Sequence, residues 1–174
     1  MDSNYTRANQ VFVTFMWVLF TTVTLSHIST YVLFNPTPTA TIAIEGLRDL
    51  TENKAFKSDQ ANLLIRFGAD FTSEFNWNAN QLYVFIVAEY ETSKKGRNEV
   101  VLYDLIIRNV SEALIPESVM VNEYPLRDQF RNTLLGNKVI LKVWYQRMPL
   151  YGLMNKVLLA ESQPFTLPKE YVRK

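Results

Sequence analysis

The chain of 174 residues contains no cysteine and only one histidine, His27. The lack of cysteine excludes disulfides, thiolate catalysis and cysteine metal sites. His27 lies inside a long apolar segment, so the rest of the chain cannot assemble a Ser-His-Asp or Cys-His catalytic group of its own. The five glycines are scattered, which excludes a glycine-rich phosphate-binding loop.

Other catalytic or metal-binding groupings have little support in the sequence. Ser93 beside Lys94 formally allows Ser-Lys chemistry, but both residues fall in a polar turn typical of solvated surface. Carboxylate-only calcium binding stays open, although Asp49, Glu52 and Asp59 do not match an EF-hand loop. We therefore expect no catalytic residue, no metal ion and no cofactor, and a chain that is not itself an enzyme.

The charges of the chain are balanced. Lysine and arginine total 18 against 17 aspartate and glutamate residues. A balanced total gives no basic surface of the kind that binds phosphate backbones. We expect no nucleic-acid partner.

One segment, residues 11–34, carries no Asp, Glu, Lys or Arg. At about 1.5 Å per residue it forms a helix of about 36 Å, enough to cross a hydrocarbon core of about 30 Å. A cleaved signal peptide is one alternative, but its apolar region is usually shorter and followed by a small-residue cleavage site. A buried core helix is another, but no amphipathic face can be drawn. The segment predicts an uncleaved transmembrane signal anchor in the lipid bilayer.

The residues that flank the span predict its orientation. Arg7 is the only basic side chain before it, and the first charges after it are Glu45 and Arg48, so the positive-inside rule places residues 1–10 in the cytosol. This is a single-pass type II arrangement, with residues 35–174 across the membrane. Of the two glycosylation sequons, which begin at Asn4 and Asn109, only the second is then eligible. The serines and threonines of the span, with His27, are expected to mark a side packed on neighbouring helices.

Residues 35–174 read as a mainly β domain. Alternation of apolar residues predicts strands at 39–45, 63–71, 138–145 and 157–161. Residues 82–88 are apolar throughout, which predicts a central strand covered on both faces, paired as a hairpin with 100–107 across a turn at 93–98. Residues 49–60 are expected to form a loop, and 148–152 a turn. Residues 111–136 are expected to hold a loop with a short helix or an edge strand. The whole predicts an antiparallel β-sandwich.

Several runs of this domain resemble a known family. They are Phe75-Asn76-Trp77-Asn78, then Gln81-Leu82-Tyr83-Val84-Phe85, Ala88-Glu89-Tyr90 and residues 98–104. Together they resemble subunit 3 of the signal peptidase complex, the glycoprotein subunit of the endoplasmic reticulum enzyme. The sequence departs from that family at Asn137-Lys138-Val139, where a sequon is common, and at Tyr145, where Asn often follows the Trp.

The resemblance implies a single-span endoplasmic reticulum membrane protein with a short cytosolic amino terminus and a lumenal β-sandwich-like domain. It also implies a non-catalytic subunit that stabilises the catalytic serine-protease subunit and associates with the accessory subunits. Phe75 and Trp77 then read either as contacts with the catalytic partner or, as large rings more often are, as sheet core or a loop anchor. The alternative function is a membrane-tethered binding or adhesion module.

Overall fold

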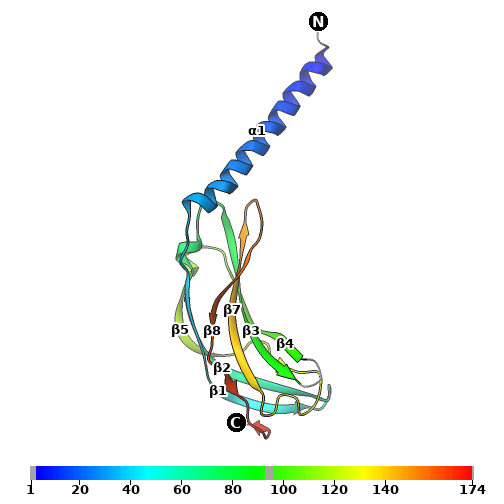
Figure 1. The fold of residues 1–174 in the computed structure, drawn as a ribbon, viewed down its shortest axis with the longest axis vertical. Helices are drawn as coiled ribbons and strands as arrows, with labels where there is room; N and C mark the ends of the chain where they lie inside the picture. The colour runs from blue at the N-terminus through cyan, green and yellow to red at the C-terminus, as the bar shows by residue number, and fades with distance from the viewer. Residues whose placement is uncertain (1–2, 93–95, 174) are drawn as a thin grey trace.

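A computed structural model describes residues 3–92 and 96–173. The helix α1 (Asn4–Leu33) stands at one end of an elongated β domain (Figure 1). At its start the Ser3 side chain accepts a hydrogen bond from the backbone N–H of Tyr5. The helix ends before Asn35-Pro36, because a proline disfavours helical backbone angles in the residue before it, here Asn35. The helix is long and apolar enough to span a membrane, and none of its residues is buried. The alternative of a buried core helix is therefore wrong.

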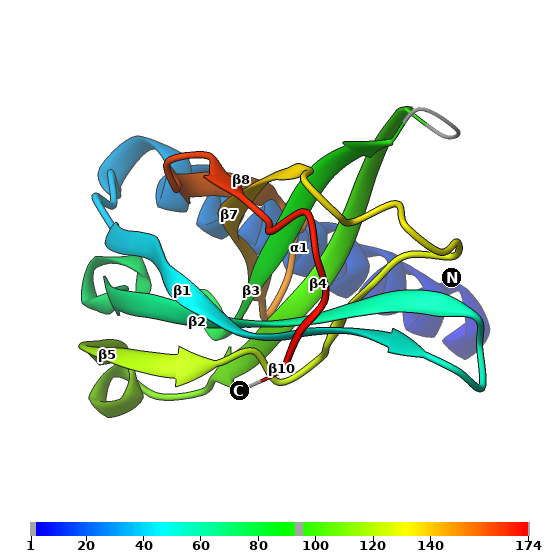
Figure 2. The same cartoon turned by 90° about the horizontal axis from the view of Figure 1, so that it is seen from below.

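The β domain consists of two antiparallel sheets, seen one above the other in Figure 2. Sheet A has the order β10-β1-β2-β5, with β6 paired to β2. Its strands are β1 (Thr39–Asn53), β2 (Ser58–Asp70), β5 (Leu114–Val121), β6 (Leu126–Arg127) and β10 (Val172–Arg173). Sheet B has the order β4-β3-β7-β8, with β9 paired to β7. Its strands are β3 (Ala79–Thr92), β4 (Gly96–Ile107), β7 (Lys138–Pro149), β8 (Lys156–Glu161) and β9 (Phe165–Thr166).

The core lies between the two sheets and confirms the predicted sandwich. The predicted alternation in β2 is present, because Leu63, Ile65 and Phe67 are buried and successive side chains of a strand point to opposite faces. From sheet B the alternate residues of β7 face the same core, namely Val139, Leu141, Val143 and Tyr145. The strand expected at 157–161 is β8.

The predicted loop at residues 49–60 is wrong. β1 continues to Asn53 and β2 begins at Ser58, so only residues 54–57 connect them. The polar side chains that suggested a loop have partners in the sheet. Asn62 Nδ2, for example, donates to both carboxylate oxygens of Asp49 at 3.0 Å. Buried Asp59 is likewise satisfied, by backbone N–H groups of residues 132–134.

The remaining expectations hold with shifted boundaries. The hairpin of residues 82–92 and 100–107 is β3 paired with β4. Of the predicted turn at 93–98, residues 93–95, with Ser93 and Lys94, lie outside the described residues, and 96–98 belong to β4. Residues 111–136 contain the edge strand β5 and the end of a 3-10 helix, η2 (Val110–Glu112). The predicted turn at 148–152 begins later, because β7 runs to Pro149.

Candidate interaction surface

No cluster that would hold a metal ion is found in residues 3–92 and 96–173, where His, Asp and Glu side chains form no group of three. The conspicuous feature is instead the face of sheet B that points away from sheet A. Because Leu82, Val84 and Ile86 of β3 face the core, the alternate residues of β3 point outward. The register then places side chains from all four main strands on what we call the sheet B face: Tyr83, Phe85, Val87, Val101, Ile106, Trp144 and Leu158.

Aromatic rings form the centre of the sheet B face. The rings of Tyr83 and Phe85 stack with centroids 5.1 Å apart. Lys156 Nζ lies 4.2 Å from the Trp144 ring and 5.0 Å from the Phe85 ring, a cation–π arrangement. The indole Nε1 of Trp144 is buried beneath these side chains.

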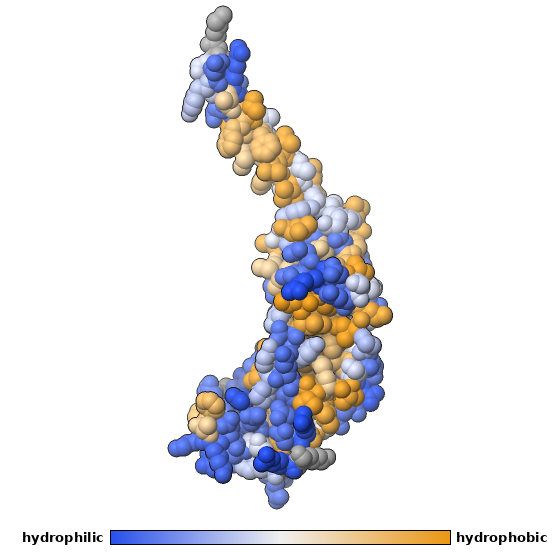
Figure 3. Space-filling view, turned by 180° about the vertical axis from the view of Figure 1, so that it is seen from behind, coloured by the Kyte–Doolittle hydropathy of each residue, from blue (hydrophilic) through white to orange (hydrophobic). Residues whose placement is uncertain are grey.

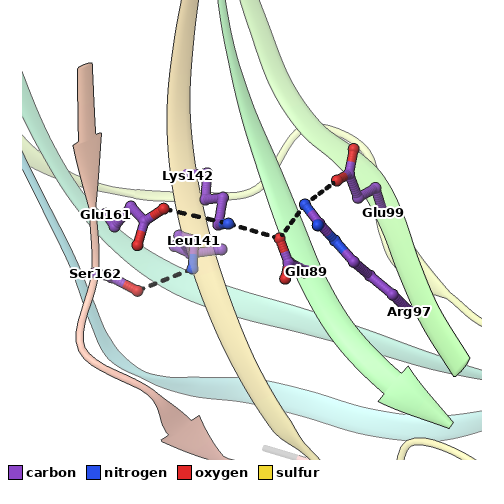
Figure 4. Close-up of polar contacts among 7 residues, drawn as sticks. All are labelled: Glu89, Arg97, Glu99, Leu141, Lys142, Glu161 and Ser162. Carbon is purple, nitrogen blue, oxygen red and sulfur yellow. Dashed lines mark hydrogen bonds and ion pairs between the residues drawn. The ribbon is translucent and has the colours of Figure 1, made fainter. Parts of the chain in front are cut away.

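A chain of ion pairs crosses the same face beside the aromatic rings (Figure 4). Lys142 Nζ lies 2.7 Å from Glu89 and 3.2 Å from Glu161, and Arg97 lies 2.9 Å from Glu89 and 2.7 Å from Glu99. The hydrogen bond from Lys142 lowers the pKa of Glu89 and raises that of Lys142. Each of these five charged side chains is therefore paired with an opposite charge within the sheet. The aliphatic side chains of the sheet B face, by contrast, can form no ion pairs or hydrogen bonds.

Three of the aliphatic side chains of the sheet B face are partly exposed. Val101 is 38% exposed, Ile106 39% and Leu158 38%. Among the described residues, every strand outside sheet B belongs to sheet A, which packs on the other face of sheet B. The prediction that 82–88 forms a central strand covered on both faces is confirmed for all its residues but Tyr83: β3 lies between β4 and β7, and the outward-facing Phe85 and Val87 are buried as well. In Figure 3, on the side that it draws, hydrophobic residues are not confined to α1 but continue onto the β domain. A large exposed apolar surface usually marks an interaction site.

The two residues singled out as partner contacts lie in different environments. Phe75 is partly buried and packs against the core, which matches the alternative reading of a core residue. Trp77 is 53% exposed, and its ring lies 6.3 Å from that of Phe34 at the end of α1. Of this pair, only Trp77 offers a broad exposed ring at the surface.

Asn109 lies just before η2, between β4 and β5. Its side chain is exposed and makes no capping hydrogen bond to η2, and Ser111 of the same sequon is exposed as well. Leu114, close by in the chain, pairs with Asp70, which in turn pairs with Thr39 at the start of β1. Asn109 is therefore near the end of the sandwich at which α1 enters.

The carboxyl-terminal part of α1 contacts the hairpin between β7 and β8. Ser26 and Tyr151 share a short hydrogen bond between their hydroxyls, and Asn155 Nδ2 donates to the Tyr31 hydroxyl at 3.3 Å. The His27 ring lies against Gly152, leaving no room for a Cβ atom there. The expectation that these groups face neighbouring helices is thus wrong for Ser26 and His27, which contact the chain's own β domain.

Comparison with known proteins assigns the chain to a family. Residues 1–170 match the family described as "Signal peptidase subunit". The chain belongs to this family. It is similar to a protein of Caenorhabditis briggsae at 27% identity over 176 residues, 98% of this chain and 97% of the relative. It is similar to a Gallus gallus protein at 30% identity, covering 75% and 72% of the two chains, and to one of Oryza sativa subsp. japonica at 39%, covering 58% and 66%. All three are named "Signal peptidase complex subunit 3".

Family membership agrees with the resemblance seen in residues 75–104 and does not support the alternative of an unrelated adhesion module. The sequence analysis does not predict the sheet B face as an interaction surface, although the uninterrupted apolar run at 82–88 indicates apolar side chains on both faces of this strand. A run of that kind says that both faces of a strand are apolar. It does not say whether the same chain covers them.

Proposed function

We propose that the protein is a non-catalytic subunit of the signal peptidase complex in the endoplasmic reticulum membrane, where it binds and stabilises the catalytic serine-protease subunit. The observation that carries this proposal is the family match over residues 1–170. The sheet B face supports it from the structure, because it combines partly exposed apolar side chains with charged side chains that are paired within the sheet. Interfaces bury such apolar centres inside polar margins.

The non-catalytic role is supported by the position of the only imidazole. His27 lies on α1, against Gly152 of the β7–β8 hairpin. Because the only histidine is on α1, the strands of the β domain carry no histidine base for a serine nucleophile. In this proposal the chemistry belongs to a partner, and the β domain contributes binding.

The proposed topology follows the charges around α1. Residues 1–10 lie in the cytosol, 11–34 span the bilayer and 35–174 form the lumenal domain, with Asn109 as the glycosylated residue. The exposure of Asn109 and Ser111 supports an accessible sequon. In sealed microsomes, protease should spare the β domain, and endoglycosidase should shift the wild type but not Asn109→Gln. A β domain digested from the cytosolic side would overturn this topology.

The proposed partners are the catalytic and accessory subunits of the complex and the surrounding lipid bilayer, with no nucleic acid. Purification of the tagged full chain in mild detergent should recover a serine endopeptidase that cleaves signal peptides. Recovery of the chain alone, under conditions that keep other membrane complexes intact, would contradict the proposal.

A further inference from the structure

The connection between β7 and β8, residues 150–155, is an apolar loop on the surface of the β domain. Leu150 is 63% exposed, Leu153 74% and Met154 60%. The neighbouring charges are Arg147, paired with buried Glu74, and Lys156, held over the Trp144 ring. No charged residue lies between them, from Met148 to Asn155. An uncharged segment with three large exposed side chains is costly to leave in water.

The loop is fastened both to the helix and to Asn78, which bonds to the backbone of Leu150 and Tyr151 at the start of the loop. Tyr151 bonds to Ser26, Gly152 packs on His27, and Asn155 bonds to Tyr31. Figure 1 shows the β7–β8 hairpin rising beside the lower end of α1. The contacts extend from position 26 to position 31 of α1, which corresponds to about 7 Å of helix axis. The depth of the loop in the bilayer is therefore set by the depth at which residues 26–31 of α1 lie.

The length of the helix fixes that depth. Residues 11–25, which precede the contacts with the loop, give only about 22 Å at 1.5 Å per residue, whereas the hydrocarbon core is about 30 Å thick. The helix cannot make up the difference at its other end without burying Gln10, Asn9 and then Arg7. The apolar layer must then include residues 26–30, and a tilted helix would need still more of them.

From these observations we infer that residues 150–155 insert into the lumenal boundary of the bilayer as a second, interfacial membrane contact. The occupant of this surface is lipid, at the level where headgroups meet acyl chains. Leu150, Leu153 and Met154 enter the apolar layer, while the hydroxyl of Tyr151 is satisfied by Ser26. Trp77, beside Phe34, belongs to the same boundary, where tryptophan rings are enriched in membrane proteins. The loop thereby fixes the orientation of the sandwich relative to the membrane.

This inference rests on the membrane anchor of the proposed function, and the test separates the two. Because the chain has no cysteine, single cysteines can be introduced and labelled with an environment-sensitive fluorophore without removing native thiols. The full-length chain is reconstituted in phosphatidylcholine nanodiscs containing lipids with a nitroxide either near the start or near the middle of the acyl chain. Three variants are compared: Leu153→Cys in the loop, Val18→Cys in the span and Phe56→Cys. Phe56, which is 69% exposed in the β1–β2 turn far from α1, is the matched control.

We expect the probe at position 153 to be quenched several-fold more strongly than the probe at position 56, and more by the shallow nitroxide than by the deep one. The probe at position 18 should respond most to the deep nitroxide. If position 18 is quenched while position 153 behaves like position 56, the anchor stands and the interfacial loop is refuted. If position 18 is not quenched, the anchor itself fails, and with it the inference.

Discussion

The hydroxyl of Tyr145 donates a hydrogen bond of 2.8 Å to the buried carboxylate of Glu74. The guanidinium of Arg147 pairs with the same carboxylate, whose side chain is fully buried. Burial, reinforced by Glu74, raises the pKa of Tyr145 to about 12. This cluster fixes the short 3-10 helix η1 (Thr72–Glu74) to the end of β7 that leads into the loop that contacts α1.

Removal of the arginine from this cluster should destabilise the domain. In Arg147→Met the charge of Glu74 stays buried with Tyr145 alone, and we expect a loss of about 3 kcal/mol, the low end for a broken buried pair because Arg147 is partly exposed. Urea unfolding of the full chain in detergent measures the loss. The double variant Glu74→Gln with Arg147→Met should recover part of it. A double variant no more stable than the single one would show that the buried charge is not the cause.

Gly152 should not tolerate a side chain. Its φ of +112° is unfavourable for other residues, and a Cβ atom would collide with the His27 ring. Gly152→Ala should cost about 1–3 kcal/mol and expose the β7–β8 loop to protease. Gly136→Ala is the matched control, with φ of +70° and its nearest neighbour 3.5 Å away, and should not affect that loop. Combining Gly152→Ala with His27→Ala should restore protection of the loop. Failure to do so would exclude the collision as the cause.

Asp59 should be essential for the segment that joins β6 to β7. Its carboxylate accepts hydrogen bonds from the backbone N–H groups of Asn132, Thr133 and Leu134 and from the hydroxyl of Tyr171. Asp59→Asn turns an NH₂ group toward these donors and should cost about 3 kcal/mol in urea unfolding, whereas Tyr171→Phe removes one bond and should cost about 1 kcal/mol. Equal effects of the two substitutions would contradict this description.

The free energy of unfolding should depend on pH through Glu89. Lys142 lowers the pKa of Glu89 below its ordinary value of 4.5, so the unfolded chain binds a proton at a higher pH than the folded protein does. The stabilisation is present above pH 4.5 and is lost as the pH falls through the folded pKa. Unfolding measured from pH 7 to pH 3 should therefore be less pH-dependent in Glu89→Gln than in the wild type. Glu91→Gln, two residues along β3, is the control and should keep the wild-type slope.

The sequence predicts those parts of the fold that depend on local periodicity. Leu63, Ile65 and Phe67 alternate because the period of a strand is two, and no distant partner is needed to see it. Polarity predicts a loop at Asp59, whereas its partners at 132–134 lie far along the chain. The polar groups Ser26 and His27 within the span likewise predict contacts with other helices. Their partners in the β7–β8 loop emerge only once the chain is folded.

We propose that the catalytic partner binds to the sheet B face, and substitution on the two sheets tests this proposal most directly. Ile106→Glu places a charge on the sheet B face, and Val119→Glu places one on the exposed edge strand β5 of sheet A, where Val119 is 53% exposed. Both side chains are partly exposed, so each glutamate can reach water, and either variant should lose only about 1 kcal/mol of stability. The tagged chains are purified in mild detergent and assayed for associated signal-peptide cleavage. We predict that Ile106→Glu loses the peptidase while Val119→Glu retains it. Retention of the peptidase at wild-type levels by Ile106→Glu would contradict the claim.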